Sequence, residues 1–180
     1  MALVTRDSLI ESKRIYDGRI ISLRKDTLAM PDKTVVAREV VEHNGGVVIA
    51  CQPEPGQVVL IKQYRYPLDK VLIELPAGRI EPGEDPFVCA KRELTEETGY
   101  KASSWQEVSR FYSTPGFCNE VLYLYKATDV TLENKCLDID EETEVLLLPL
   151  EEAWSRCCKG EIADAKTIAG LALLRGLQSG

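Results

Sequence analysis

One helix is firmly bounded in this sequence. Pro86 suits the first turn of a helix, and Gly99 is the residue type that most often ends one. On the helix between them, Glu93 and Glu97 are four residues apart and Glu96 is three residues from Glu93. Residues at these spacings lie on the same side of a helix, so the three carboxylates share one face. Any fold for this chain must accommodate that acidic face.

Helix geometry alone leaves two explanations of the acidic face open. Like charges at these spacings repel, and negative charge near a helix C-terminus opposes the macrodipole. A solvated acidic face has to tolerate both effects. A hard divalent cation relieves both, because Mg²⁺ binds carboxylate oxygens and keeps waters for substrate phosphates. Arg92 could then hold one carboxylate in a bidentate pair.

The rest of the chain reads as short strands with a few helices. Asp17 and Gly18 predict a hairpin in the first forty-five residues. Later strands are predicted in GVVIACQ, QVVLIKQYRY, VLIELPAG, SWQEVSRFYS, EVLYLYKATDV and VLLLPL, and further helices in EEAWSRCCKG and DAKTIAGLALLRGL. Strands and helices in mixed order predict an α/β or α+β sandwich.

Composition excludes several classes of function. The net charge is −7 with no basic run, so a nucleic-acid partner is not expected. No run of about 18 apolar residues occurs and the N-terminus has no apolar core, so we expect a soluble, cytoplasmic protein with no membrane partner. The six cysteines form no C-x-x-C pair, and His43 is the single histidine. Zinc sites and histidine-based triads are therefore poorly supported.

Residues 78–100 match the Nudix box, G-x5-E-x7-R-E-U-x-E-E-x-G-U, where U is bulky and apolar. The nine specified positions are occupied by Gly78, Glu84, Arg92, Glu93, Leu94, Glu96, Glu97, Gly99 and Tyr100. Tyr100 is the one departure, because that position is commonly aliphatic. The chain thus resembles the Nudix hydrolases, which cleave a nucleoside diphosphate linked to another group.

This resemblance implies a fold and a domain organisation. The expected fold class is α/β (α+β), a Nudix α/β/α sandwich with a mixed sheet and a small N-terminal antiparallel β lobe. Residues 1–45 would form the lobe, with a role in dimerisation and in contacts to the substrate base, and residues 46–180 would form the catalytic domain. A homodimer is expected.

The flanks of the box are similar to the ADP-ribose pyrophosphatase group. ELPAGRIEPGE contains Ala77, and STPGFCNE places Pro115 sixteen residues after Gly99. The similarity extends over roughly residues 35–152. It implies hydrolysis of ADP-ribose to AMP and ribose 5-phosphate with Mg²⁺, or alternatively Mn²⁺. The implied metal ligands are the carbonyl of Ala77 and the carboxylates of Glu93, Glu96 and Glu97.

The same resemblance assigns the remaining site residues. The base lies in the acidic loop LDIDEETE, at Glu141 or, after a one-residue slip, Glu142, with Glu97 as a further catalytic residue. Substrate contacts are expected from Arg65, Arg79, Pro115 and Gly116. A solvated acidic turn and a surface Arg65 are the alternatives. Trp105 and Trp154 are expected to serve packing.

Two other functions stay open at this point. A GDP-mannose pyrophosphatase would share the ELPAG flank. A domain that binds ADP-ribose without hydrolysing it is also possible, although such a domain usually lacks box glutamates, and this chain keeps all of them.

Overall fold

The computed structural model describes residues 4–133 and 143–178. The chain divides into two compact units. The first comprises Met1–Gly45 and Tyr112–Val121, and the second comprises Gly46–Phe111 and Leu122–Gly180.

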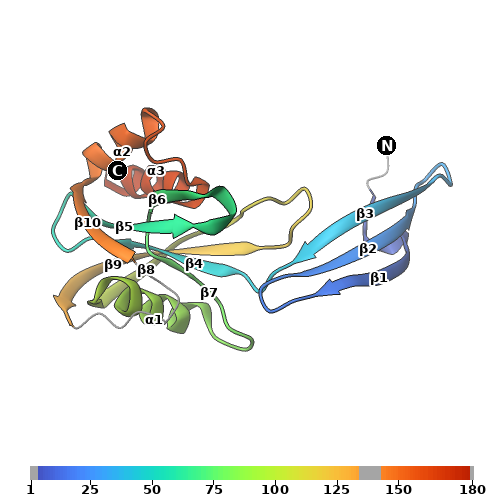
Figure 1. The fold of residues 1–180 in the computed structure, drawn as a ribbon, viewed down its shortest axis with the longest axis horizontal. Coiled ribbons are helices and arrows are strands. Elements are labelled where there is room, and N and C mark those ends of the chain that lie inside the picture. The colour runs from blue at the N-terminus through green and yellow to red at the C-terminus, as the bar shows by residue number, and fades with distance from the viewer. Residues whose placement is uncertain (1–3, 134–142, 179–180) are drawn as a thin grey trace. The chain divides into compact units, whose positions relative to one another are not determined.

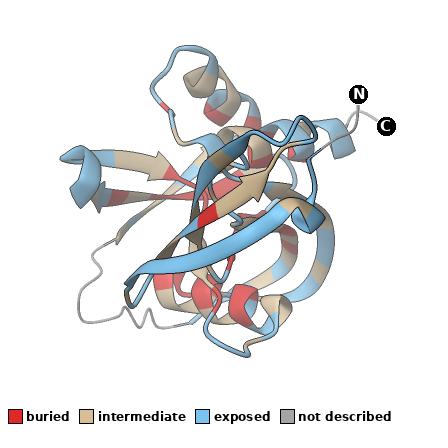
Figure 2. Cartoon of the chain, turned by 90° about the vertical axis from the view of Figure 1, so that its right-hand side faces the viewer, coloured by how far each residue is buried: buried red, intermediate tan, exposed pale blue. Residues whose placement is uncertain are grey.

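The first unit is built on an antiparallel sheet in the order β1-β2-β3 (Figure 1). Its elements are the 3₁₀ helix η1 (Arg6–Ser8) and the strands β1 (Leu9–Asp17), β2 (Ser22–Ala29) and β3 (Val35–Glu42). Asp17 pairs with Ser22 across the first turn, which confirms the hairpin predicted at Asp17 and Gly18. Every residue of β1 is exposed, although β1 is an edge strand that carries apolar side chains (Figure 2).

The segment 112–121 is hydrogen-bonded to the end of β3. Val41 N–H donates to the carbonyl of Phe117 (2.8 Å), and His43 N–H donates to Oδ1 of Asn119 (2.8 Å). The Nδ1 atom of His43 accepts from Gly45 N–H at 3.1 Å and lies 3.2 Å from Oε1 of Glu120. The single histidine is thus engaged within this turn.

The second unit contains a mixed sheet and an antiparallel sheet. The mixed sheet has the order β7-β4-β9-β8, in which β4 is parallel to β9 and antiparallel to β7. The antiparallel sheet has the order β10-β5-β6. The strands are β4 (Gly46–Cys51), β5 (Gln57–Arg65), β6 (Lys70–Glu74), β7 (Ala77–Arg79), β8 (Tyr100–Tyr112), β9 (Val121–Leu132) and β10 (Thr143–Pro149), and the 3₁₀ helix η2 (Tyr66–Leu68) follows β5.

The helix α1 (Pro86–Thr98) has the bounds that local sequence signals predict. Asp85 caps its start by accepting from the N–H groups of Phe87 and Val88, and Pro86 occupies the first turn. Gly99 ends it in the left-handed conformation, with φ of 74°. The other helices are α2 (Leu150–Cys158) and α3 (Ala165–Gln178).

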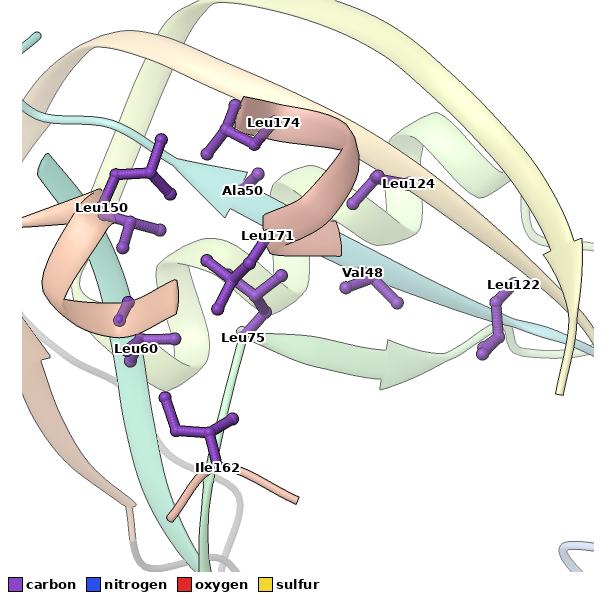
Figure 3. Packing of buried hydrophobic residues seen from close by; sticks show 12 residues of the cluster. Val48, Ala50, Leu60, Leu75, Leu122, Leu124, Leu150, Ile162, Leu171 and Leu174 are labelled. Atoms are coloured by element: carbon purple, nitrogen blue, oxygen red, sulfur yellow. The ribbon is translucent and has the colours of Figure 1, made fainter. Parts of the chain in front are cut away.

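The fully buried strand β4 separates two hydrophobic cores. Val48 and Ala50 face one core together with Leu150 of α2 and Leu171 of α3 (Figure 3). The alternate residues Val47, Ile49 and Cys51 face a second core with Cys89, Ala90 and Leu94 of α1. This follows from the two-residue period of a strand, and Figure 1 shows α1 on one side of the sheets with α2 and α3 on the other. The predicted α/β/α sandwich is confirmed.

Two sequence expectations about strands need correction. VLIELPAG is predicted as one strand, but β6 ends at Glu74 and β7 begins at Ala77 in the other sheet. Pro76 interrupts the ladder because it has no N–H to donate. The strand predicted in SWQEVSRFYS begins earlier, at Tyr100, directly after the glycine that ends α1.

Across residues 4–133 and 143–178, no helix combines the length and the apolar character that crossing a membrane requires.

Replacement of Leu124 by alanine tests the core between the sheets and α3. Leu124 of β9 is completely buried, so Leu124→Ala is expected to lower the free energy of unfolding by about 2–5 kcal/mol. Leu132→Ala on the same strand removes an exposed side chain and should change it by less than about 0.5 kcal/mol. Urea unfolding followed by circular dichroism measures both, and equal losses would contradict this core.

Candidate active site

The acidic face of α1 points inward rather than to solvent. Glu93 is only 9% exposed to solvent and Glu97 only 1%, while Glu96 is partly exposed. Leu94 and Ala90 on the adjoining side of the helix pack into the core and hold this face in place. Because a buried carboxylate must be hydrogen-bonded or paired with a cation, the two buried glutamates require specific partners.

Gly78 allows Glu93 to reach the backbone of β7. A Cβ atom built at Gly78 would lie 1.8 Å from Cδ and 2.0 Å from Oε1 of Glu93. No side chain can be accommodated at that distance. A side chain at position 78 would therefore displace the Glu93 carboxylate that packs on Gly78.

The backbone of residues 75–77 is held from three directions. Ala77 N–H donates to Oε2 of Glu97 at 2.9 Å, and Leu75 N–H donates to Oγ1 of Thr167 in α3 at 2.8 Å. The carbonyl of Pro76 accepts from Ile49 N–H of β4 at 2.8 Å. The segment that carries the Ala77 carbonyl is thus fixed by α1, α3 and β4 together.

Arg92 binds three of the box carboxylates. Its Nε and Nη2 atoms donate to the two oxygens of Glu84 at 3.0 and 3.1 Å. Its Nη1 atom donates to Oε1 of Glu93 at 2.7 Å and to Oε2 of Glu96 at 2.9 Å. The hydrogen bond from Arg92 is the main reason that the pKa of Glu84 is lowered to about 2, so Glu84 is ionised at neutral pH.

The donor set of this face fits a hard divalent cation. Carboxylate oxygens of Glu93, Glu96 and Glu97 with a backbone carbonyl suit Mg²⁺ or Mn²⁺, whereas zinc sites usually include His or Cys. In the described arrangement Arg92 supplies the positive charge beside these carboxylates. Across residues 4–133 and 143–178, no three His, Cys, Asp or Glu side chains are already gathered in the form of a metal site.

The two arginines expected at the substrate both pair with nearby glutamates. Nε and Nη2 of Arg65 donate to the two oxygens of Glu74, each at 2.7 Å. This hydrogen bond is the leading cause of the raised pKa of Arg65, and the charge of Glu97 contributes. A phosphate contact would have to use Nη1 or displace Glu74. Arg79 donates from Nη2 to Oε1 of Glu81 at 2.7 Å.

A buried network behind Arg65 was not found from the sequence. Glu74 is 1% exposed and also pairs with Lys166, whose Nζ lies 3.0 Å from Oδ2 of Asp164. Asp164 Oδ2 accepts from the hydroxyl of Thr167, the residue that holds Leu75. No sequence motif marks this network, because its members are brought together only by the packing of α3.

Four further residues are expected at the site from the sequence. Pro115 and Gly116 are exposed residues of the first unit. Glu141 and Glu142 lie outside the described residues. Thr143, which follows Glu142 in the sequence, donates from Oγ1 to the backbone carbonyl of Glu97 at 3.0 Å.

Comparison with known proteins decides the family. Residues 42–171 match the NUDIX domain. The chain belongs to the Nudix family. It is 34% identical over 171 residues to an ADP-ribose pyrophosphatase of Bacillus subtilis, covering 94% of this chain and 92% of that protein. It is 38% identical over 184 residues to a GDP-mannose pyrophosphatase of Cronobacter sakazakii, covering 94% of each.

A solved structure of an ADP compounds hydrolase supports the Nudix fold. It superposes with a TM-score of 0.84 and 20% identity, covering 96% of this chain and 94% of that chain. At this identity the likeness bears on the fold alone. Hydrolases of the Nudix family generally depend on a divalent metal ion, in agreement with the oxygen donors on α1.

Substitution of Gly78 tests the contact between β7 and α1. Gly78→Ala forces Glu93 away from the backbone, so we expect the rate of hydrolysis to fall by about 10- to 100-fold, as for loss of a residue that orients metal ligands. Gly176→Ala is the control, because a Cβ atom at Gly176 meets nothing within 4 Å. Full activity in Gly78→Ala would show that the position of Glu93 does not matter.

Proposed function

We propose that this protein hydrolyses the pyrophosphate of ADP-ribose, with Mg²⁺, to AMP and ribose 5-phosphate. The observation that carries the proposal is the burial of Glu93 and Glu97 against the backbone of Ala77 and Gly78. It places carboxylate oxygens on one face of a helix. The likeness to an ADP-ribose pyrophosphatase over 94% of the chain supports the choice of substrate.

The metal would be held by the carbonyl of Ala77 and the carboxylates of Glu93, Glu96 and Glu97. A bound Mg²⁺, with Mn²⁺ as an alternative, would spread negative charge away from the phosphates. The chain itself orients these ligands. Arg92 fixes one oxygen each of Glu93 and Glu96, and the N–H of Ala77 fixes Oε2 of Glu97.

The general base is proposed to be Glu141, with Glu142 as the second choice and Glu97 as a further catalytic residue. Support comes from the hydrogen bond between Thr143 and the carbonyl of Glu97, because Thr143 directly follows this acidic pair. A base beyond the box is needed, since the box carboxylates serve as ligands and a ligand is poorly placed to accept a proton.

Arg65, Arg79, Pro115 and Gly116 are proposed to contact the substrate. Arg65 is partly buried, and the negative charge of Glu97 contributes to its raised pKa. This supports a position of Arg65 near the carboxylates of α1. The bidentate pair with Glu74 would keep it oriented for an anion. The proposed substrate contact of Arg79 is supported by its position in β7, next to Gly78.

A homodimer and a cytoplasmic location complete the proposal. The lobe formed by residues 1–45 would provide the dimer contact and contacts to the substrate base. Ile10, Ile15 and Tyr16 are exposed apolar residues of the edge strand β1. Edge strands and exposed apolar side chains favour association, which supports a second copy on this lobe. The proposal of a cytoplasmic location rests on the sequence alone.

GDP-mannose hydrolysis is the second candidate. The specific observation in its favour is the 38% identity to a GDP-mannose pyrophosphatase over 94% of both chains. The proline-containing segment around Pro115, which resembles the ADP-ribose group, favours the first candidate. A domain that only binds ADP-ribose is disfavoured, because all the box glutamates are present.

A substrate panel tests the function. Purified protein with Mg²⁺ is assayed side by side against ADP-ribose, GDP-mannose, NADH and FAD, with release of the nucleoside monophosphate as the readout. We expect the highest kcat/KM for ADP-ribose and no turnover after chelation of the metal. A clear preference for GDP-mannose would replace the first candidate by the second. Tight binding of ADP-ribose without turnover would favour a domain that binds ADP-ribose and does not hydrolyse it.

Glutamine variants separate the metal ligands from the base. Glu97→Gln should lower kcat by at least about 100-fold and weaken the dependence on Mg²⁺, because it removes a charged ligand. Glu141→Gln should lower kcat by about 10²–10⁴-fold and leave Mg²⁺ affinity nearly unchanged.

Glu144→Gln provides the matched control, because Glu144 is an exposed residue of β10 whose carboxylate pairs with Lys62 at 2.8 Å. It should retain normal turnover. Normal turnover in Glu141→Gln together with loss in Glu142→Gln would move the base by one residue. Normal turnover in both would remove the base from this loop.

Light scattering coupled to gel filtration tests the dimer. We expect twice the chain mass of 20.1 kDa for the wild type and a shift toward one chain mass for Ile15→Glu, which places a charge on exposed β1. Val88→Glu, at an exposed apolar position on α1, is the control. A monomeric wild type would refute the dimer.

A further inference from the structure

A cavity of about 460 Å³ lies in the second unit beside the first turn of α1. Its aromatic lining consists of Phe87 from α1, Trp105 from β8, and Tyr123 and Tyr125 from β9. Small-molecule sites fall in this range of volume. None of these residues belongs to the proposed catalytic machinery.

The aromatic rings hold one another in fixed orientations. Phe87 and Trp105 meet edge to face, with centroids 5.6 Å apart and ring planes at 88°. Trp105 and Tyr125 meet in the same way, at 6.4 Å and 78°. Such pairs are favourable arrangements of ring quadrupoles, so the aromatic lining is formed before any ligand arrives.

The cavity carries charges of both signs, with two carboxylates near its rings. Asp85 and Glu107 are negative, Arg110 is positive, and the ammonium of Lys91 lies 4.0 Å from the centroid of Phe87, so these four charges balance. The pKa of Tyr125 is raised, first by burial and then by the charges of Glu107 and Asp85, which places its ring in their negative field.

Cations of the protein already lie over two of these rings, Lys91 over Phe87 and Arg110 over Tyr123. The guanidinium carbon of Arg110 is 5.1 Å from the centroid of Tyr123. Nε and Nη2 of Arg110 donate to the two oxygens of Glu107 at 2.6 and 3.2 Å. Arg110 therefore uses both attractions that a bound cation would use, a ring face and a carboxylate.

The hydrogen bonds around the cavity argue against a nucleobase. The indole N–H of Trp105 donates to the carbonyl of Ala102 at 3.0 Å, and Oδ1 of Asp85 accepts the N–H groups that cap α1. The fork of Arg110 is taken up by Glu107. A nucleobase needs polar partners along its edge, whereas a quaternary ammonium group needs only ring faces and nearby negative charge.

We propose that this aromatic cavity binds a small organic cation of the quaternary ammonium class, with Arg110 as an internal competitor for the same ring and carboxylate. The site is independent of the proposed hydrolysis, because it uses a different set of residues.

Choline and its uncharged isostere 3,3-dimethylbutan-1-ol are the probes, titrated at constant ionic strength. The readout is the emission of Trp105 in Trp154→Phe, a variant that removes the second tryptophan. In case that variant fails to fold, the indole N–H signal of Trp105 in nitrogen-15 NMR of the wild type gives the same information. We expect a saturable change with choline and about tenfold weaker binding of the isostere.

Two variants of the charged pair should act in opposite directions. Arg110→Met removes the competitor and frees Glu107, so choline should bind about tenfold more tightly. Glu107→Gln removes a carboxylate and leaves the charge of Arg110 at the cavity, so binding should weaken. The matched controls are Arg156→Met and Glu152→Gln on α2, where the same residue types pair at 2.6 Å and neither should change binding.

Three results would overturn the proposal. The first is equal binding of choline and its isostere, which would indicate an apolar cavity without charge preference. The second is weaker choline binding by Arg110→Met. The third is the lack of any saturable response of Trp105 to choline in folded protein, including the case in which adenine or AMP produces one.

Discussion

The burial of two carboxylates against a glycine backbone is the constraint on which this structure depends. Glu93 and Glu97 are nearly inaccessible to water, and a buried ionised carboxylate is strongly destabilising unless it is paired. Arg92 and the N–H of Ala77 provide the pairing, and the missing side chain of Gly78 provides the space. The helix and the short strand β7 therefore stabilise each other through this contact.

The two-sided packing of β4 supports this contact. One side of β4 packs on α1, and the other packs on the core that includes α2 and α3. Ile49 of β4 and Thr167 of α3 then hold the backbone on either side of Pro76. The segment that carries the Ala77 carbonyl, which we propose as a metal ligand, is thereby held from both layers.

Local sequence signals were sufficient to predict the bounds of α1 and the shared face of its glutamates. Pro86, Gly99 and the spacing of the carboxylates all belong to this one helix and its ends. Long-range features were not predictable in the same way. The parallel pairing of β4 with β9 and the ion pair between Glu74 and Lys166, 92 residues apart, depend on packing that no short pattern encodes. The division of VLIELPAG between two sheets has the same origin, since Pro76 marks a break but not the sheet that follows it.

We propose that the inward face of α1 holds a divalent metal for attack on a pyrophosphate. Anomalous diffraction from crystals grown with Mn²⁺ and AMP tests it most directly, because manganese can be located independently of any refined ligand. We expect an anomalous peak bounded by carboxylate oxygens of Glu93 and Glu97 and by the carbonyl of Ala77. Well-diffracting crystals with no peak there, or with manganese bound only elsewhere, would contradict the account.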